Sequence, residues 1–165
     1  MGSIEWLNAN APGFRNLTLG ELEAITHFSL VWSFFEAKVL NNNANTAQLR
    51  ATAKKLDAAG RLTPTDFDEE LSYFRNRYVS GGNFTEFFDG LYLDRQNPDD
   101  QALVEGVLRG QNNNLSDIVA ALLIIVYRFR NNYFHGEKWA YDMRGQLDNF
   151  NRANALLRRV FELCA

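Results

Sequence analysis

The stretch from Ile118 to Tyr127 is an uninterrupted run of ten apolar side chains, and it constrains the fold more than any other part of the chain. Its length is about half of the roughly 20 residues that a membrane-spanning helix needs. A shorter helix that is apolar all round is surrounded by other elements or lies in a subunit interface. We therefore predict a central helix that starts at Ser116-Asp117, and we expect no insertion into a membrane.

Most of the remaining chain repeats apolar residues at three- and four-residue intervals, the spacing of one helix face. Further helices are expected over residues 18–40, 48–59, 66–80, 98–110 and 143–163. Thr18 and Glu21 have the spacing of a capping box, and Gly60 is placed to end the second helix. Residues 1–16 are expected to be irregular, and residues 84–93 suit either a short helix or an extended segment. Because no run alternates as strands do, the sequence predicts one all-α domain over residues 1–165.

The composition indicates an ordinary globular domain in a reducing compartment. With 165 residues and 46% hydrophobic side chains, the chain can bury a core without disulfides or metals. Its single cysteine, Cys164, has no partner within the chain, and the first residues lack the pattern of a secretory signal. A cytoplasmic location is therefore expected. With only two histidines and one cysteine, the chain does not offer a zinc site with the usual ligand spacing, so no metal or other cofactor is expected.

The charge is distributed unevenly along the chain. The formal net charge of −3 argues against a protein that coats nucleic acid indiscriminately. Residues 128–165 nevertheless contain seven Lys or Arg against four Asp or Glu, whereas residues 1–127 contain ten against sixteen. This excess of positive charge indicates either a nucleic-acid contact or a last helix with a solvated basic face.

Directly after the apolar run comes Arg-Phe-Arg-Asn-Asn-Tyr-Phe-His-Gly-Glu-Lys, residues 128–138. An imidazole changes protonation near neutral pH, and a guanidinium binds phosphate through a fork of N–H groups. The amides of Asn131 and Asn132 add neutral hydrogen-bonding groups between them. This combination of residue types could act on a phosphodiester.

Arg130, the polar Asn131 directly after it and His135, at the end of a long helix in a small helical domain, resemble the motif of the HEPN superfamily. The resemblance implies an up-and-down bundle of about five main helices and a homodimer in which two Arg/His pairs form one composite cleft. It also implies metal-independent endoribonuclease activity, as in toxins, abortive-infection proteins and CRISPR-associated nucleases, with a possible cognate antitoxin. One branch has a tyrosine two positions after the histidine, the target of an antitoxin that transfers nucleotides. This chain has Glu137 there, which argues against that type of control.

RNA cleavage without a metal requires a base for the 2′-hydroxyl, a cation for the phosphate oxygens and an acid for the leaving 5′-oxygen. We assign His135 as base or acid, Arg130 as the phosphate clamp and Asn131 as the residue that orients one of them. The products would be a 2′,3′-cyclic phosphate and a 5′-hydroxyl. Five helical steps rotate by about 140°, so a straight helix would not stack Arg130 under His135. Either the last turn unwinds ahead of Gly136 or the two pairs meet across a dimer, and this favours a site shared between two copies. Further RNA contacts are expected from Arg128, Asn132 and Lys138.

Three other interpretations stay open. Arg and His in a last helical turn commonly satisfy free carbonyl groups, so the motif can be a helix end. Aromatic residues around it (Tyr127, Tyr133, Phe134, Trp139 and Tyr141) could stack bases in a domain that binds RNA or a nucleotide without cutting it, although core packing suits most of them better. A helical interaction module that pairs with a partner through the central helix is the third.

Overall fold

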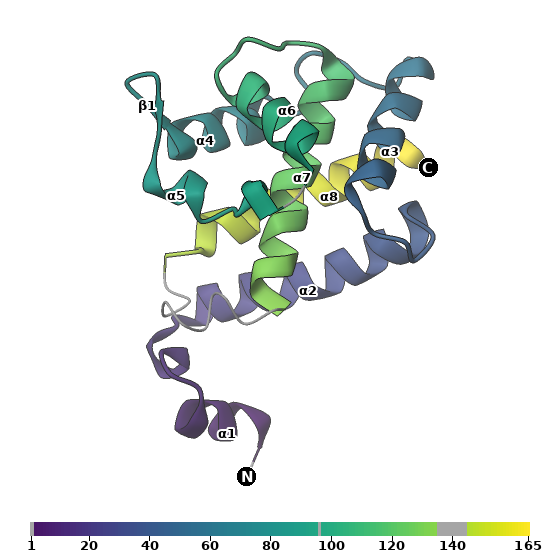
Figure 1. The fold of residues 1–165 in the computed structure, drawn as a ribbon. Coiled ribbons are helices and arrows are strands. Elements are labelled where there is room, and N and C mark those ends of the chain that lie inside the picture. The colour runs from purple at the N-terminus through teal and green to yellow at the C-terminus, as the bar shows by residue number, and fades with distance from the viewer. Residues whose placement is uncertain (1, 96, 135–144) are drawn as a thin grey trace.

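The computed structural model describes residues 2–95, 97–134 and 145–165, and over these the chain is an all-α bundle, as predicted (Figure 1). Among the described residues, six helices of 11 residues or more make up the body, accompanied by two short helices, two 3-10 helices and one hairpin of two-residue strands. The elements are α1 (Ser3–Asn10), η1 (Phe14–Asn16), α2 (Leu19–Val39), α3 (Thr46–Ala58), α4 (Asp68–Tyr78), β1 (Val79–Ser80), β2 (Asn83–Phe84), α5 (Glu86–Asp89), η2 (Leu93–Arg95), α6 (Pro98–Leu108), α7 (Leu115–Phe134) and α8 (Leu147–Cys164).

Helix α7 is the central helix expected from the apolar run. It passes through the middle of the body and packs against α3 and α6, with α2 and α8 beside its second half (Figure 1). Every side chain from Ala121 to Val126 is fully buried. The side chain of Asn114 caps its start by accepting a hydrogen bond from Asp117 N at 3.1 Å. The prediction that neighbouring helices cover this segment is confirmed.

Helices α2 and α8 form the most extensive helix pair, and aromatic rings fill the space between them and α7. Phe28 of α2 lies 5.0 Å from Phe150 of α8, and Trp32 lies 5.9 Å from Tyr127 of α7, measured between ring centroids. Phe28 and Trp32 are at most 2% exposed. Aromatic pairs of this kind add about 0.5–1.5 kcal/mol beyond the area that they bury. This cluster therefore fixes the position of α7's C-terminal half against α2.

The predicted capping box at the start of α2 is confirmed. Thr18 Oγ1 accepts from Glu21 N at 3.2 Å, and Glu21 Oε2 accepts from Thr18 N at 2.9 Å. The predicted ends of α2 and α3 are also confirmed. Asn41 and Asn42 follow α2 and Gly60 follows α3, and all three adopt left-handed backbone conformations (φ 52°, 59° and 64°). Asn and Gly tolerate this region best, and it stops a helix.

Thr18→Ala is expected to lower the free energy of unfolding by about 1 kcal/mol, since it removes the acceptor for Glu21 N. Chemical denaturation monitored by circular dichroism measures the change. Thr26→Ala, which makes the same substitution at an exposed position inside α2, is the control and is expected to be neutral or slightly stabilising. Equal losses in the two variants would contradict a capping role for Thr18.

Two expectations about local structure need correction, and a third, for residues 84–93, had left two structures open. The segment 1–16 is not irregular, because Ser3–Asn10 is a helix in which Glu5 Oε2 accepts from Gly2 N at 2.9 Å. Residues 84–93 adopt both of the structures considered, since Phe84 ends the hairpin and α5 follows directly. The last helix begins at Leu147 rather than near Met143; Gly145 before it is left-handed (φ 71°), and residues 143–144 lie outside the described residues.

Among the described residues, none of the helices combines the length and the apolar character that crossing a membrane would require.

Candidate functional site

Arg130 lies on the side of α7 that faces α2, at the edge of the body. Its Nη1 donates a hydrogen bond to Asn131 Oδ1 at 3.0 Å, and its Nη2 is 4.0 Å from Glu36 Oε2. The same Glu36 oxygen accepts from Trp32 Nε1 at 2.8 Å. The side chain of Arg130 is 30% exposed and that of Glu36 23%, so water and a ligand can reach this cation. The structure thus brings together Arg130 and Asn131, two of the three predicted catalytic residues.

Arg128 and Asn132 lie one helical turn apart on a different, buried face of α7. Arg128 Nε donates to the carbonyl oxygen of Leu91 at 2.7 Å, and its Nη2 is 3.4 Å from Asn132 Oδ1. Asn132 Nδ2 donates to the carbonyl oxygen of Gly90 at 2.9 Å. These bonds satisfy the backbone where α5 ends, and they tie that segment to the central helix.

The prediction that Arg128 and Asn132 contact RNA is therefore wrong. Arg128 is 6% exposed and Asn132 is 2% exposed, which leaves no surface for a phosphate. The physical reason is that the carbonyl groups of Gly90 and Leu91 would otherwise be buried without donors, and a buried unpaired carbonyl costs about 1–3 kcal/mol. Both side chains serve the fold.

His135 and Lys138, the two remaining predicted site residues, lie outside the described residues. The chain is described again from Gly145, whose N–H donates to Glu21 Oε1 at 2.8 Å. Described residues before and after this segment thus contact α2. Arg130 lies near Glu36 in the C-terminal half of α2, and Gly145 bonds to Glu21 in the first turn of α2.

Tyr133 and Tyr127, two of the aromatic residues near the motif, are partly buried and pack against the core, the role that the sequence favoured for most of these rings. Tyr133 packs edge-on against Phe150 at 6.1 Å between ring centroids, and Tyr127 donates from its hydroxyl to the carbonyl oxygen of Ala44 at 3.3 Å. Burial raises the pKa of Tyr133 above its ordinary value of 10, and a hydrogen bond with Ser29 opposes this only in part. Tyr133 therefore stays neutral near pH 7 and does not supply a general base. Trp139 and Tyr141 are outside the described residues.

The basic face expected on the last helix is paired with acids. Arg152 Nη1 lies 2.6 Å from Glu69 Oε2, and Arg159 Nη2 lies 2.6 Å from Asp66 Oδ1. These pairs join α8 to α4 and to the turn before α4, so most of this positive charge is compensated. In the part of the chain that the structure describes, no three His, Cys, Asp or Glu side chains gather as they would around a metal ion.

Glu36 is the site residue that sequence reasoning missed. It belongs to α2, far from the motif in sequence, and nothing in the spacing of α2 marks it as different from the other surface acids. Only the packing of α7 across α2 brings its carboxylate to Arg130.

No family model, no curated protein and no solved structure matches this chain. The resemblance to HEPN proteins therefore stays an expectation from the motif residues of the sequence.

Proposed function

We propose that the chain is a metal-independent endoribonuclease of the HEPN type, acting in the cytoplasm as a toxin or a phage-defence factor. The observation that supports this most is the placement of Arg130. Its guanidinium is partly exposed at the end of the central helix, is held by Asn131, and precedes His135 by five residues.

In this proposal each group performs one part of the reaction. His135 removes the proton from the 2′-hydroxyl or delivers one to the leaving 5′-oxygen. Arg130 neutralises the charge that builds up on the non-bridging phosphate oxygens. The bond from Arg130 Nη1 to Asn131 Oδ1 restricts the guanidinium to one orientation, which reduces the entropy lost when a phosphate binds. A homodimer would supply both a base and an acid from its two histidines, with Lys138 as a further RNA contact and an antitoxin as a possible partner.

Analysis of the products tests the proposal. Purified protein is incubated with mixed RNA in EDTA, and the new ends are identified. We expect 2′,3′-cyclic phosphates and 5′-hydroxyls, and we expect an RNA with a single 2′-deoxynucleotide at the cleaved position to resist there. Cleavage that requires a divalent metal, or that leaves 5′-phosphates, would contradict the proposed mechanism.

A domain that binds RNA without cutting it is the second candidate, and the position of Glu36 favours it over a nuclease. A carboxylate 4.0 Å from the Arg130 guanidinium offsets part of its positive charge, which lowers the stabilisation that this cation can give to a transition state. The same incubation separates the two candidates, because a binding domain retains the RNA and releases no products.

Glu36→Gln is expected to tighten RNA binding by about two- to fivefold, which corresponds to the free energy of a partly exposed ion pair. The amide oxygen keeps the acceptor for Trp32 Nε1 but removes the negative charge beside Arg130. Fluorescence anisotropy with a 2′-O-methyl RNA, which cannot be cleaved, measures the affinity at fixed salt.

Glu69→Gln is the matched control, since Glu69 pairs with Arg152 on another part of the surface. Weaker binding by Glu36→Gln than by the unmodified protein would show the opposite role, in which Glu36 holds Arg130 in its binding position.

A further inference from the structure

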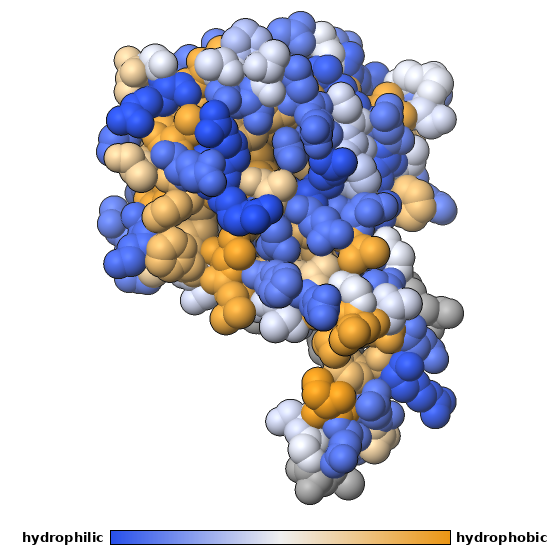
Figure 2. Space-filling model, turned by 180° about the vertical axis from the view of Figure 1, so that it is seen from behind, coloured by the Kyte–Doolittle hydropathy of each residue, from blue (hydrophilic) through white to orange (hydrophobic). Residues whose placement is uncertain are grey.

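Two apolar side chains of α2, Leu30 and Phe34, are exposed one helical turn apart. They are 66% and 50% exposed, whereas Phe28, Trp32 and Phe35 of the same helix are at most 2% exposed. Figure 2, which shows the molecule from behind, has apolar areas set in a mainly hydrophilic surface. Single exposed apolar residues are ordinary, but neighbouring ones that line a hollow indicate a binding site.

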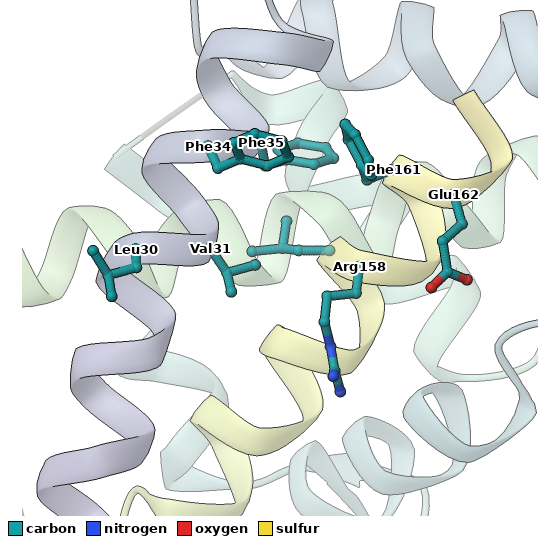
Figure 3. Close-up of a pocket in the computed structure, with 8 residues that line it drawn as sticks. Leu30, Val31, Phe34, Phe35, Arg158, Phe161 and Glu162 are labelled. Carbon is teal, nitrogen blue, oxygen red and sulfur yellow. The ribbon is translucent and has the colours of Figure 1, made fainter. Parts of the chain in front are cut away.

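Leu30 and Phe34 belong to one wall of a groove between α2 and α8 (Figure 3). Phe34 meets Phe161 of α8 at one end of it, with ring centroids 5.0 Å apart. Phe35 and Leu157, which are at most 1% exposed, also line the groove and close it towards the core. The volume of the groove is about 410 Å³, within the range of small-molecule sites.

The groove is short along both helices. It follows residues 30–35 of α2 and 157–162 of α8, which at 1.5 Å per residue is about 8 Å along each axis. A partner helix that docks through several turns would extend beyond it at both ends. The apolar chain of a small molecule suits this length better.

Arg158 is the only cation in the lining, and among the described residues it has no acidic partner. Its Nε donates to the carbonyl oxygen of Asn154, one turn earlier in α8, at 3.3 Å. That bond holds the side chain against its own helix and leaves the two terminal nitrogens for a ligand. The other arginines of α8 differ, since Arg152 and Arg159 each lie 2.6 Å from a carboxylate oxygen.

Glu162, the acid in the lining, does not neutralise Arg158. Its Oε2 lies 3.6 Å from Arg159 Nη1, and Figure 3 shows its carboxylate apart from the Arg158 guanidinium. The groove therefore combines apolar walls with one uncompensated cation at its margin. A guanidinium binds a carboxylate through two parallel N–H bonds, which makes an organic acid the complementary ligand.

We infer that the groove between α2 and α8 binds a small amphipathic carboxylate. Its apolar chain lies along Leu30, Phe34 and Phe161, and its carboxylate accepts N–H bonds from Arg158. A neutral apolar molecule would leave the guanidinium unused. A ligand with further polar groups would have to desolvate them against the apolar walls, which is costly.

This site goes beyond the ribonuclease proposal and does not depend on it. Phe34 and Glu36 are two steps apart on α2, a rotation of about 200°, so the groove lies on the side of α2 turned away from Arg130. A ligand in the groove leaves the Arg130 guanidinium uncovered. Binding is measured without RNA, so the two proposals succeed or fail independently.

Titration of the full chain with octanoate, followed by two-dimensional NMR, tests the site. We expect a dissociation constant below about 1 mM, with amide shifts concentrated at residues 30–35 and 157–162. Octylammonium has the same chain with the opposite charge and is expected to bind at least about tenfold more weakly. Absence of octanoate binding, shifts concentrated elsewhere, or equal affinity for the two probes would overturn the inference.

Two substitutions separate the contribution of the charge from that of the walls. Arg158→Gln is expected to weaken octanoate binding about three- to tenfold and to reduce the preference over octylammonium. Arg152→Gln removes a paired arginine of the same helix and should leave the affinity unchanged. An Arg158→Gln variant that binds octanoate as tightly as the unmodified protein would refute the role of Arg158.

Leu30→Glu places a negative charge in the groove and should abolish octanoate binding. Leu19→Glu is its control, because Leu19 is 72% exposed on the same helix, about 16 Å before Leu30 at 1.5 Å per residue. Both positions are exposed, so neither substitution should unfold the chain, and circular dichroism checks this. Equal affinities in the two folded variants would show that octanoate does not occupy the groove.

Discussion

His135→Ala and Arg130→Ala are each expected to lower the rate of RNA cleavage by at least about a hundredfold. A positioned general acid or base contributes about 10²–10⁴-fold, and one preorganised donor to a developing oxyanion about 10²–10³-fold. Because both act on the same transition state, the double variant should be little slower than the worse single one. Single-turnover kinetics with saturating protein measure the chemical step.

The chain provides a matched control for each of these two substitutions. His27 is the other histidine and is exposed on α2, so His27→Ala should cleave at the unmodified rate. Arg152 resembles Arg130 in exposure, 37% against 30%, and in having a glutamate partner, so Arg152→Ala controls for loss of a surface ion pair. Cleavage that persists in both His135→Ala and Arg130→Ala would exclude the mechanism. Equal losses in Arg152→Ala would point to a general effect of positive charge instead.

The helices were predictable because local signals and burial coincide in them. The capping box at Thr18, the repeated apolar stripe of α2 and the left-handed Gly60 are all encoded within a few residues. Helix α1 was not predicted because none of its residues is buried, so its sequence lacks the regular spacing of apolar residues that marks a helix face. Its start depends on a backbone-to-Glu5 hydrogen bond, a weaker signal than a Ser or Thr cap.

The candidate site was harder to predict because helix rotation separates residues that are neighbours in sequence. Arg128 and Arg130 are two steps apart, a rotation of about 200°, so one must face away from the other. Since α7 is apolar all round before them, periodicity could not tell which arginine faces inward. The carbonyl groups that accept from Arg128 and Asn132, those of Leu91 and Gly90 respectively, come from a remote segment whose sequence gives no sign that it contacts α7.

The apolar groove between α2 and α8, which Leu30, Phe34 and Phe161 help to line (Figure 3), also has a signal in the sequence. Leu30 and Phe34 are four residues apart and lie off the buried stripe of Phe28, Trp32 and Phe35. A second apolar row on a helix whose first row already fills the core indicates a contact beyond that core. The partner for this row could not be inferred from α2 alone, because the groove also needs Phe161 from α8.

Arg128→Ala is expected to lower the free energy of unfolding by about 2–4 kcal/mol, because it leaves a buried cavity and an unpaired Leu91 carbonyl. Arg128→Met keeps most of the volume and should lose about 1–3 kcal/mol, the share of the missing hydrogen bonds. Urea denaturation, monitored by tryptophan fluorescence and circular dichroism together, measures both changes.

Arg61→Ala is the control, because Arg61 is exposed and a surface substitution usually changes stability by less than about 0.5 kcal/mol. The series also decides between the two roles considered for Arg128. If Arg128 contacts phosphate, Arg128→Ala should weaken RNA binding and leave the unfolding free energy unchanged. If Arg128 joins α7 to the end of α5 inside the protein, Arg128→Ala should lower the unfolding free energy and leave RNA binding by the folded protein unchanged. Since Arg130 lies half a helical turn away, Arg130→Ala should show the opposite pattern, with little loss of stability and a large loss of cleavage. A destabilised Arg130→Ala beside a stable Arg128→Ala would mean that α7 is rotated relative to the arrangement described, and the assignment of the phosphate clamp would then move to Arg128.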